Sequence, residues 1–144
     1  MIGIEERFAT ALHSTARVWR QALNRRLKHL GISQAGWMTI AAVAKSKTPL
    51  SQSELADALG VEGATMVAMI DRLVKAQLVT REPSTTDRRI KHVALTEAGN
   101  RIYAKLRAEA EAFRREILAG VDHEQLRAAS DLLERLQSLV DPRT

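Results

Sequence analysis

Three charged residues, Asp87, Arg88 and Arg89, lie together in a polar stretch between two short apolar runs. Residues 84–86 are Ser, Thr and Thr, which favour a turn because their hydroxyl groups hydrogen-bond to nearby backbone. Two guanidinium groups at the tip of a hairpin suit a narrow DNA minor groove, where the negative potential is strongest. A free carboxylate would be repelled there, so we expect Asp87 to hold an arginine side chain extended. The alternative is an ordinary solvated loop.

The elements on either side of this loop are expected to be β-strands. Apolar and β-branched residues recur over residues 79–82 and 90–95, and a helix is expected to begin at Thr96. The sequence therefore predicts a β-hairpin with a basic tip, followed directly by a helix.

Two short helices are predicted immediately before the hairpin. Ser51 and Glu54 have the spacing of a capping box, which starts a helix that ends at Gly60. A second helix is expected over residues 62–77, and this pair has helix-turn-helix spacing. The alternative is an ordinary helical hairpin in an all-α core. The apolar face of the second helix is expected to comprise Met66, Val67, Ile70, Leu73 and Val74, and its outward face Gly63, Ala64, Thr65, Ala68, Met69 and Arg72.

Longer helices are predicted at both ends of the chain. A helix over residues 4–30 ends at Gly31, a second starts at Ser33, and a third starts at Thr96. A last helix, with Asp122 and Gln125 as a second capping-type pair, carries a heptad seam that requires a helical partner. The seam comprises Leu126, Ala129, Leu133, Leu136 and Val140.

Composition narrows the possible classes of function. The 144 residues are 45% hydrophobic but only 3% aromatic, and the net charge is +5, which favours a polyanionic partner. From residue 96 onward acidic residues outnumber basic ones, so the polyanion-binding part is expected to precede it. The absence of cysteine excludes disulfides and thiolate metal sites. We see no membrane-span or signal-peptide pattern, so a cytoplasmic location is expected.

Catalytic motifs are not found. The four histidines, at positions 13, 29, 92 and 123, are too dispersed for an obvious metal site, and H-E-x-x-H and G-x-S-x-G do not occur. No glycine-rich phosphate loop is present. We therefore expect no enzyme activity, no metal and no cofactor.

The sequence resembles the MarR family of winged-helix regulators, most closely its SlyA-like branch. The resemblance rests on D-R-R at 87–89 with V-A-L-T-E-A-G at 93–99, and on V-E-G-A-T-M-V-A-M-I-D-R-L-V at 61–74. It extends to R-V-W-R at 17–20, S-Q-A-G-W at 33–37 and R-E-I-L-A-G at 115–120, so it covers nearly the whole chain.

The resemblance implies a mainly α fold with a small β-hairpin (α+β). Residues 33–95 would form a winged helix-turn-helix, and residues 1–32 and 96–144 a helical dimerisation region. It also implies a homodimer on a palindromic DNA operator, with half-sites roughly 10 bp apart. The residues expected to contact DNA are Ser51, Ser53, Gly63, Ala64, Thr65, Ala68, Met69, Arg72, Arg81, Asp87, Arg88, Arg89 and Lys91.

One position departs from the pattern of this branch, whose members tend to have arginine where this chain has Ala68. Direct contact with guanine edges is then weak, and methyl contacts with thymine and DNA shape must contribute more to specificity. Arg89 is the better candidate for minor-groove insertion, and Arg88 the second.

The resemblance also implies a small aromatic acid as a ligand. Arg17 supplies a guanidinium for a carboxylate and Trp19 and Trp37 supply indole rings, with His13 as a further candidate. The alternative is that both tryptophans belong to the core and Arg17 to the surface.

The sequence therefore predicts a homodimeric DNA-binding regulator, acting as a repressor or as an activator that displaces another DNA-bound protein. A winged-helix module that binds protein is the alternative, and a small-molecule enzyme is a remote one.

Overall fold

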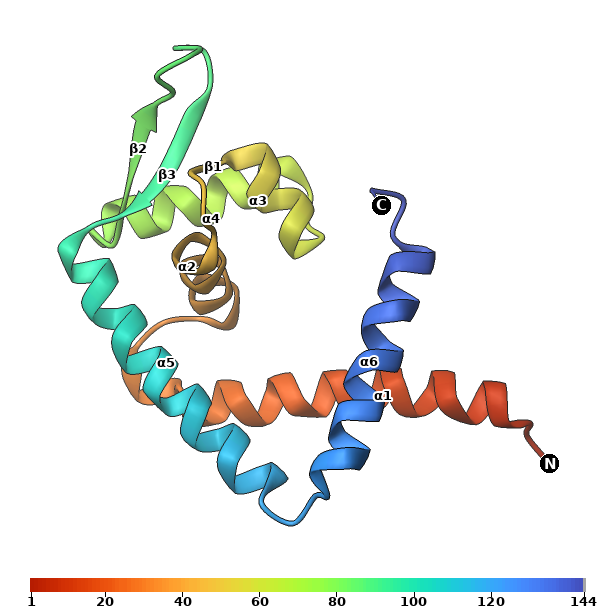
Figure 1. The fold of residues 1–144 in the computed structure, drawn as a ribbon. Helices are drawn as coiled ribbons and strands as arrows, with labels where there is room; N and C mark the ends of the chain where they lie inside the picture. The colour runs from red at the N-terminus through yellow and green to blue at the C-terminus, as the bar shows by residue number, and fades with distance from the viewer. Residues whose placement is uncertain (144) are drawn as a thin grey trace. The chain divides into compact units, whose positions relative to one another are not determined.

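The computed structural model describes residues 1–143. It confirms the predicted fold class, since helices dominate and the small sheet is antiparallel. The chain forms two compact units, Met1–Ala110 and a second that begins at Glu111. The assignment of residues 1–32 and 96–144 to dimerisation stays a prediction. The elements in chain order are α1 (Ile4–Arg26), a 3-10 turn (Lys28–Leu30), α2 (Gln34–Lys45), β1 (Leu50–Ser51), α3 (Gln52–Leu59), α4 (Gly63–Lys75), β2 (Val79–Pro83), β3 (Lys91–Leu95), α5 (Glu97–Leu118) and α6 (His123–Val140) (Figure 1).

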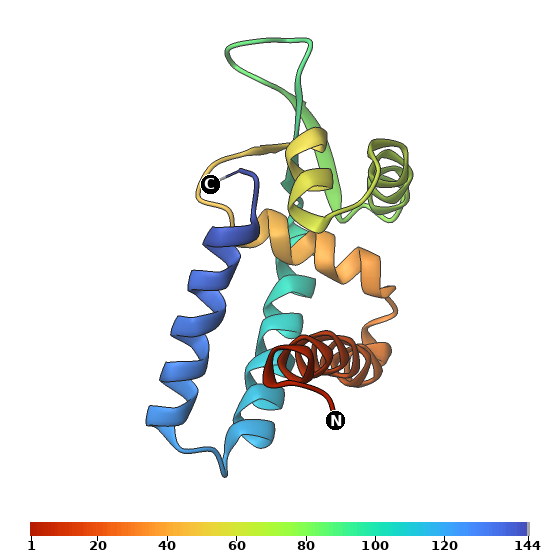
Figure 2. The same ribbon diagram turned by 90° about the vertical axis from the view of Figure 1, so that its right-hand side faces the viewer.

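The sheet has one strand more than the sequence predicts. Its order is β1-β3-β2, and both pairings are antiparallel. Leu50 of β1 lies opposite Val93, while Val79 of β2 lies opposite Leu95. A strand of two residues is too short to show an alternation of apolar and polar side chains, so β1 carries no sequence signal. The β2–β3 hairpin extends away from α2, α3 and α4 (Figure 2).

Most predicted helix boundaries are confirmed. Ser33 Oγ accepts a hydrogen bond from Gly36 N at 3.1 Å, and Ser51 and Glu54 form the reciprocal capping box. Gly60 ends α3 in the left-handed conformation, with φ 67°. The first helix is shorter than predicted, because α1 ends at Arg26 and the chain continues as a 3-10 turn.

The prediction of a capping-type pair at the start of α6 is wrong. Asp122 occupies the N-cap position, but its side chain makes no capping hydrogen bond in the described structure. The helix therefore begins at His123 without the reciprocal contacts that the spacing to Gln125 suggested.

The main core joins the three helices α2, α3 and α4 to the sheet. Ile40, Leu55, Ile70 and Val79 are each at most 1% exposed and belong to one cluster. A second, smaller cluster contains Leu27, Trp37 and Leu106. The main core therefore holds α4 and the base of the hairpin on one scaffold.

The predicted orientation of α4 is partly wrong. Met69 was expected on the outward face but is 7% exposed and packs in the main core, whereas Val67 and Val74 are 39% and 36% exposed. The buried face is Met66, Met69, Ile70 and Leu73, which has the i, i+3, i+4, i+7 spacing of one helix side. Because valine and methionine are both apolar, periodicity did not distinguish the two neighbouring faces.

The start of α5 packs tightly against the chain that enters β2. Thr96 Oγ1 donates to the carbonyl oxygen of Gln77 at 2.7 Å and accepts from Gly99 N at 3.0 Å. A Cβ atom on Gly99 would lie 2.1 Å from the carbonyl oxygen of Leu78. Glycine is therefore required at this junction.

Helices α1 and α6 each carry several large apolar side chains that remain exposed. In the first unit, Ile4, Phe8 and Leu12 of α1 are 70%, 36% and 39% exposed. In the second unit, Leu133 and Val140 of α6 are 42% and 78% exposed. Within residues 1–143, no helix combines the length and apolarity needed to cross a membrane.

Candidate nucleic-acid interface

Helix α4 presents a face of small and polar side chains to solvent. Gly63, Ala64, Thr65, Ala68 and Arg72 are all exposed, as the sequence predicts. Small residues in the first turns allow close approach to a groove wall, and the N-terminus of a helix attracts phosphate. This face has the chemistry of a recognition helix, although Met69 is no part of it.

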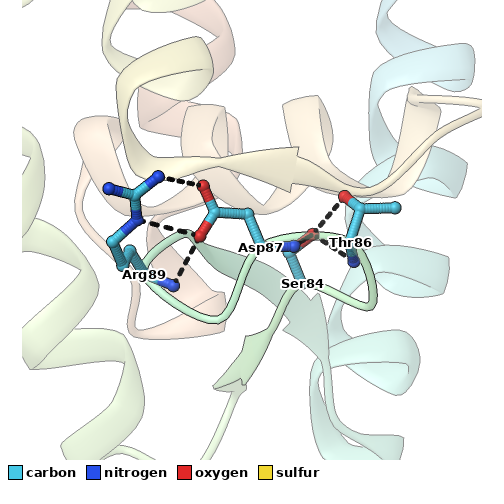
Figure 3. Close-up of polar contacts among 4 residues, drawn as sticks. All are labelled: Ser84, Thr86, Asp87 and Arg89. Atoms are coloured by element: carbon cyan, nitrogen blue, oxygen red, sulfur yellow. Dashed lines mark hydrogen bonds and ion pairs between the residues drawn. The ribbon is translucent and has the colours of Figure 1, made fainter.

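The loop at the hairpin tip is shaped by Ser84, which is 6% exposed. Its Oγ accepts hydrogen bonds from Thr86 N at 3.2 Å and Asp87 N at 3.3 Å (Figure 3). The backbone closes the loop, because Ser84 N donates to Ile90 O at 2.9 Å and Ile90 N donates to Asp87 O at 3.0 Å. These contacts delay the start of β3 to Lys91, one residue later than predicted.

Asp87 holds Arg89, as the sequence analysis expects. Arg89 donates to Asp87 from its backbone N, Nε and Nη2, each at 3.1 Å (Figure 3). The Arg89 side chain is 90% exposed, against 32% for Asp87. The Arg89 side chain, followed by its backbone N–H, lowers the pKa of Asp87, and Asp87 raises the pKa of Arg89. The tip therefore presents a permanently charged guanidinium whose base is fixed.

The remaining predicted DNA contacts fall into two groups. Ser53, Arg88 and Lys91 are exposed and open to a partner. Ser51 is half-buried and serves as the cap of α3: the bonds with the Ser51 backbone and side chain lower the pKa of Glu54.

Arg81 differs from these residues because its side chain lies between elements of the protein. It donates from Nε to Gln52 Oε1 at 2.6 Å and from Nη2 to a carboxylate oxygen of Asp71. No sequence pattern indicates this arrangement, since Gln52, Asp71 and Arg81 are far apart in the chain.

A cavity of about 210 Å³ lies beneath α4, between that helix and α2, with Arg20 of α1 also on its wall. Its wall combines apolar side chains with two guanidinium groups, and three of the four methionines of the chain contribute to it. The lining residues are Arg20, Gln34, Ala35, Met38, Thr39, Leu59, Val61, Thr65, Met66, Met69 and Arg72.

The predicted ligand residues do not line this cavity. Trp37 is 7% exposed, packs with Leu27 and donates from Nε1 to Asn24 Oδ1 at 3.1 Å, which is the arrangement of a core residue. His13 and Arg17 are exposed on α1. The α1 residue that contributes a guanidinium group to the cavity wall is Arg20, not Arg17. Arg20 follows Arg17 by three residues, which is nearly one helical turn.

Metal-binding geometry is not found in the described residues 1–143. They contain no group of three histidine, aspartate or glutamate side chains arranged to hold an ion. His92 lies across the sheet from Ser51, and its charge contributes, after the Ser51 hydrogen bonds, to the lowered pKa of Glu54.

Comparison with known proteins agrees with this architecture. A profile described as the MarR family matches residues 30–90. The crystal structure of the transcriptional regulator PA3341 is 36% identical, with a TM-score of 0.87, and the match covers 93% of this chain and 98% of that one.

Two more distant structures share the fold and contain ligands. CouR from Rhodococcus jostii RHA1, bound to p-coumaroyl-CoA, is 21% identical with a TM-score of 0.83, and the match covers 99% of this chain and 97% of CouR. Staphylococcus aureus MarR, in complex with salicylate and kanamycin, is 18% identical with a TM-score of 0.84, with coverages of 96% and 94%. Together with the exposed small-residue face of α4 and the basic hairpin, the similarity over almost the whole length shows that this chain belongs to the MarR family of transcriptional regulators, which are not enzymes.

Proposed function

We propose that this protein is a homodimeric transcription regulator that binds double-stranded DNA in a sequence-specific manner. The observation that carries the proposal is the pairing of two exposed elements on one scaffold: the small-residue face of α4 and the Arg89 side chain fixed by Asp87. The first fits a major groove and the second a minor groove.

Recognition by α4 depends on few polar side chains. Thr65 and Arg72 supply the hydrogen-bonding groups of the exposed face, and Ala64 and Ala68 supply methyl groups. Methyl groups contact the C5-methyl of thymine, while arginine pairs with guanine edges or phosphate. Specificity therefore comes from thymine contacts, from Arg72 and from the shape of the minor groove at Arg89.

Dimerisation is supported by the apolar side chains that α1 and α6 leave exposed. Exposed apolar side chains repeated along one helix mark protein interfaces, and a twofold dimer buries the same patch of both subunits. Two recognition helices would then meet half-sites roughly 10 bp apart on a pseudo-palindromic operator. Binding to DNA with no membrane contact agrees with the cytoplasmic location expected from the sequence.

A small aromatic carboxylate is the modulator that the cavity beneath α4 suits. Arg20 and Arg72 can pair with a carboxylate, and the methionine and aliphatic side chains can enclose a ring. A volume of about 210 Å³ is below the roughly 300–1,000 Å³ of sites for drug-sized ligands. It suits a single-ring acid such as salicylate, whereas a coenzyme A thioester would keep its nucleotide outside.

The position of this cavity suggests how a ligand regulates DNA binding. Thr65 and Arg72 both line it and both belong to the exposed part of α4. A ligand that binds better to one orientation of α4 shifts the population of dimers toward that orientation. Dimers with mis-spaced recognition helices would then leave the operator.

The decisive experiment is selection of bound fragments from a random pool of duplex DNA by the full-length protein, with and without salicylate. We expect enrichment of a pseudo-palindromic sequence whose recovery falls when salicylate is added. Enrichment of no sequence, with weak binding to every duplex, would refute sequence-specific regulation. It would favour the alternative, a winged-helix module that binds protein.

A further inference from the structure

Arg81 joins the hairpin to both helices of the helix-turn-helix. It lies on β2, opposite Val93, and its Nε donates to Oε1 of Gln52, the first residue of α3, at 2.6 Å. Its Nη2 donates to the Asp71 carboxylate and, at 3.4 Å, to the carbonyl oxygen of Val67, both in α4. One side chain therefore connects the wing to the two helices that must enter DNA with it.

The Arg81 side chain is much more buried than that of its charged partner, Asp71. The Arg81 side chain is 27% exposed and that of Asp71 is 61% exposed. Arg81 binds two different residues through two nitrogens of its planar guanidinium, Nε to Gln52 and Nη2 to Asp71, which fixes the plane in a way that a single ion pair does not. Two of the three guanidinium nitrogens of Arg81 are therefore engaged inside the protein.

We propose that the Arg81–Asp71 pair is a positioning device that sets the direction of the wing relative to α4, so that Arg89 reaches the minor groove when α4 occupies the major groove. This inference rests on the proposed DNA binding. It reassigns Arg81, which the sequence analysis placed among the DNA contacts, to a role in which it acts through Arg89.

The core fixes the base of the wing through Val79 of β2 and Val93 of β3, but it includes no residue from 82 to 91. A two-stranded hairpin is marginally stable alone, and β1 supports β3 over only two residues. When α4 and the wing bind one duplex together, any motion of the wing relative to α4 must be lost. The conformational entropy lost in this ordering weakens the affinity for DNA. A link at the base of the wing removes this freedom before DNA is bound.

Asp71 offers the sharpest test because its charge has the wrong sign for a DNA contact. Removing an exposed carboxylate from a DNA-binding surface should strengthen binding to a polyanion by general electrostatics. If Asp71 instead positions the wing, Asp71→Asn should weaken binding, by about tenfold, the effect typical of removing a charged hydrogen-bond partner. Asp57→Asn, at an exposed acidic position of α3, is the matched control and should bind equally well or better.

The experiment measures affinity over a range of salt concentrations for the duplex that the wild type selects. The expected result has three parts. Asp71→Asn and Arg81→Met weaken binding with no loss of salt dependence. Arg81→Lys, which keeps the charge but not the two separate donor nitrogens, does not restore wild-type affinity. Arg89→Ala costs much less affinity in the Asp71→Asn background than in the wild type.

A measurement without DNA completes the test and detects misfolding. Circular dichroism of Asp71→Asn should match the wild type, while ¹⁵N relaxation should show greater motion of residues 84–90 than in the Asp57→Asn control. Unchanged or tighter DNA binding by Asp71→Asn, additivity with Arg89→Ala, or an unchanged wing would each overturn the proposal. Failure of the wild type to select any duplex would instead refute the proposed function, and the relaxation data would still decide whether the pair restrains the wing.

Discussion

Asp87 and Arg89 form a closed unit at the tip of the wing, in which one carboxylate accepts three hydrogen bonds from a residue two positions later. One bond comes from the backbone and two from the guanidinium, so Asp87 fixes both the turn and the direction of the arginine stem. The arginine nevertheless remains 90% exposed. A charged group that is oriented but solvent-accessible can enter a groove with little loss of conformational entropy.

The first prediction concerns the pH dependence of this unit. Because Arg89 lowers the pKa of Asp87, the hydrogen bonds are present above the ordinary aspartate value of about 3.9 and are lost as the pH falls through the lower value in the folded protein. An NMR titration of side-chain carboxyl carbons should place the pKa of Asp87 below the ordinary aspartate value. Arg89→Ala should raise the pKa of Asp87 toward the ordinary value, with the backbone N–H of residue 89 still bound, and an unchanged midpoint in that variant would contradict the assigned cause.

The second prediction compares the two arginines at the tip. Arg89→Ala should weaken duplex binding and reduce the slope of log affinity against log salt by about one phosphate contact. Arg88→Ala should have the smaller effect, because Arg89 is the one that Asp87 holds. The measurement is fluorescence anisotropy with labelled duplex at several salt concentrations. Equal losses for both variants would show that orientation by Asp87 is unimportant.

The wing and the helix caps were predictable because their signals are local. The D-R-R tip, the hydroxyl-rich turn and the capping box at Ser51 each depend on residues fewer than seven positions apart, and the structure has all three. Local hydrogen bonds of this kind are set by residue type and spacing alone.

Features that depend on packing between distant segments were not predictable. Met69 is buried because α4 rotates its methionine-rich side toward α2, and a single sequence does not show that choice. The Arg81 network joins residues 29 and 10 positions apart, and the cavity joins α1, α2 and α4. Trp37 was a candidate ligand contact because tryptophan suits both binding sites and cores, and its burial with Leu27 and Leu106 places it in the core.

The third prediction concerns backbone strain between α4 and β2. Gln77 has φ 65°, a left-handed conformation that costs a non-glycine residue about 1–2 kcal/mol. Gln77→Gly should raise the melting temperature, since this gain exceeds the roughly 0.5–1 kcal/mol of added backbone entropy in the unfolded chain. Gly60→Ala is the reciprocal change, because Gly60 has φ 67° with open space around it, and it should lower the melting temperature. Thermal unfolding followed by circular dichroism tests both, and a drop for Gln77→Gly would refute the strain argument.

The fourth prediction concerns the seam on α6. Leu133 is 42% exposed, so Leu133→Glu should leave the fold of the subunit intact but place a charge in the proposed dimer interface. Analytical ultracentrifugation should show a shift from dimer to monomer at micromolar concentration. Ala128→Glu, an exposed position on the opposite side of the same helix, should remain dimeric. A monomeric wild type would refute the dimer itself.

The fifth prediction tests the cavity beneath α4 against the residues that the sequence suggested. Arg20 lines the cavity and Arg17 does not. If the cavity binds a single-ring acid through its guanidinium groups, salicylate should raise the melting temperature of the wild type by mass action, and Arg20→Met should remove most of that rise. Arg17→Met changes the same chemical group at an exposed position one turn away, so its response to salicylate should match the wild type. The opposite result, with Arg17→Met insensitive and Arg20→Met unaffected, would move the ligand out of the cavity and onto the exposed surface of α1.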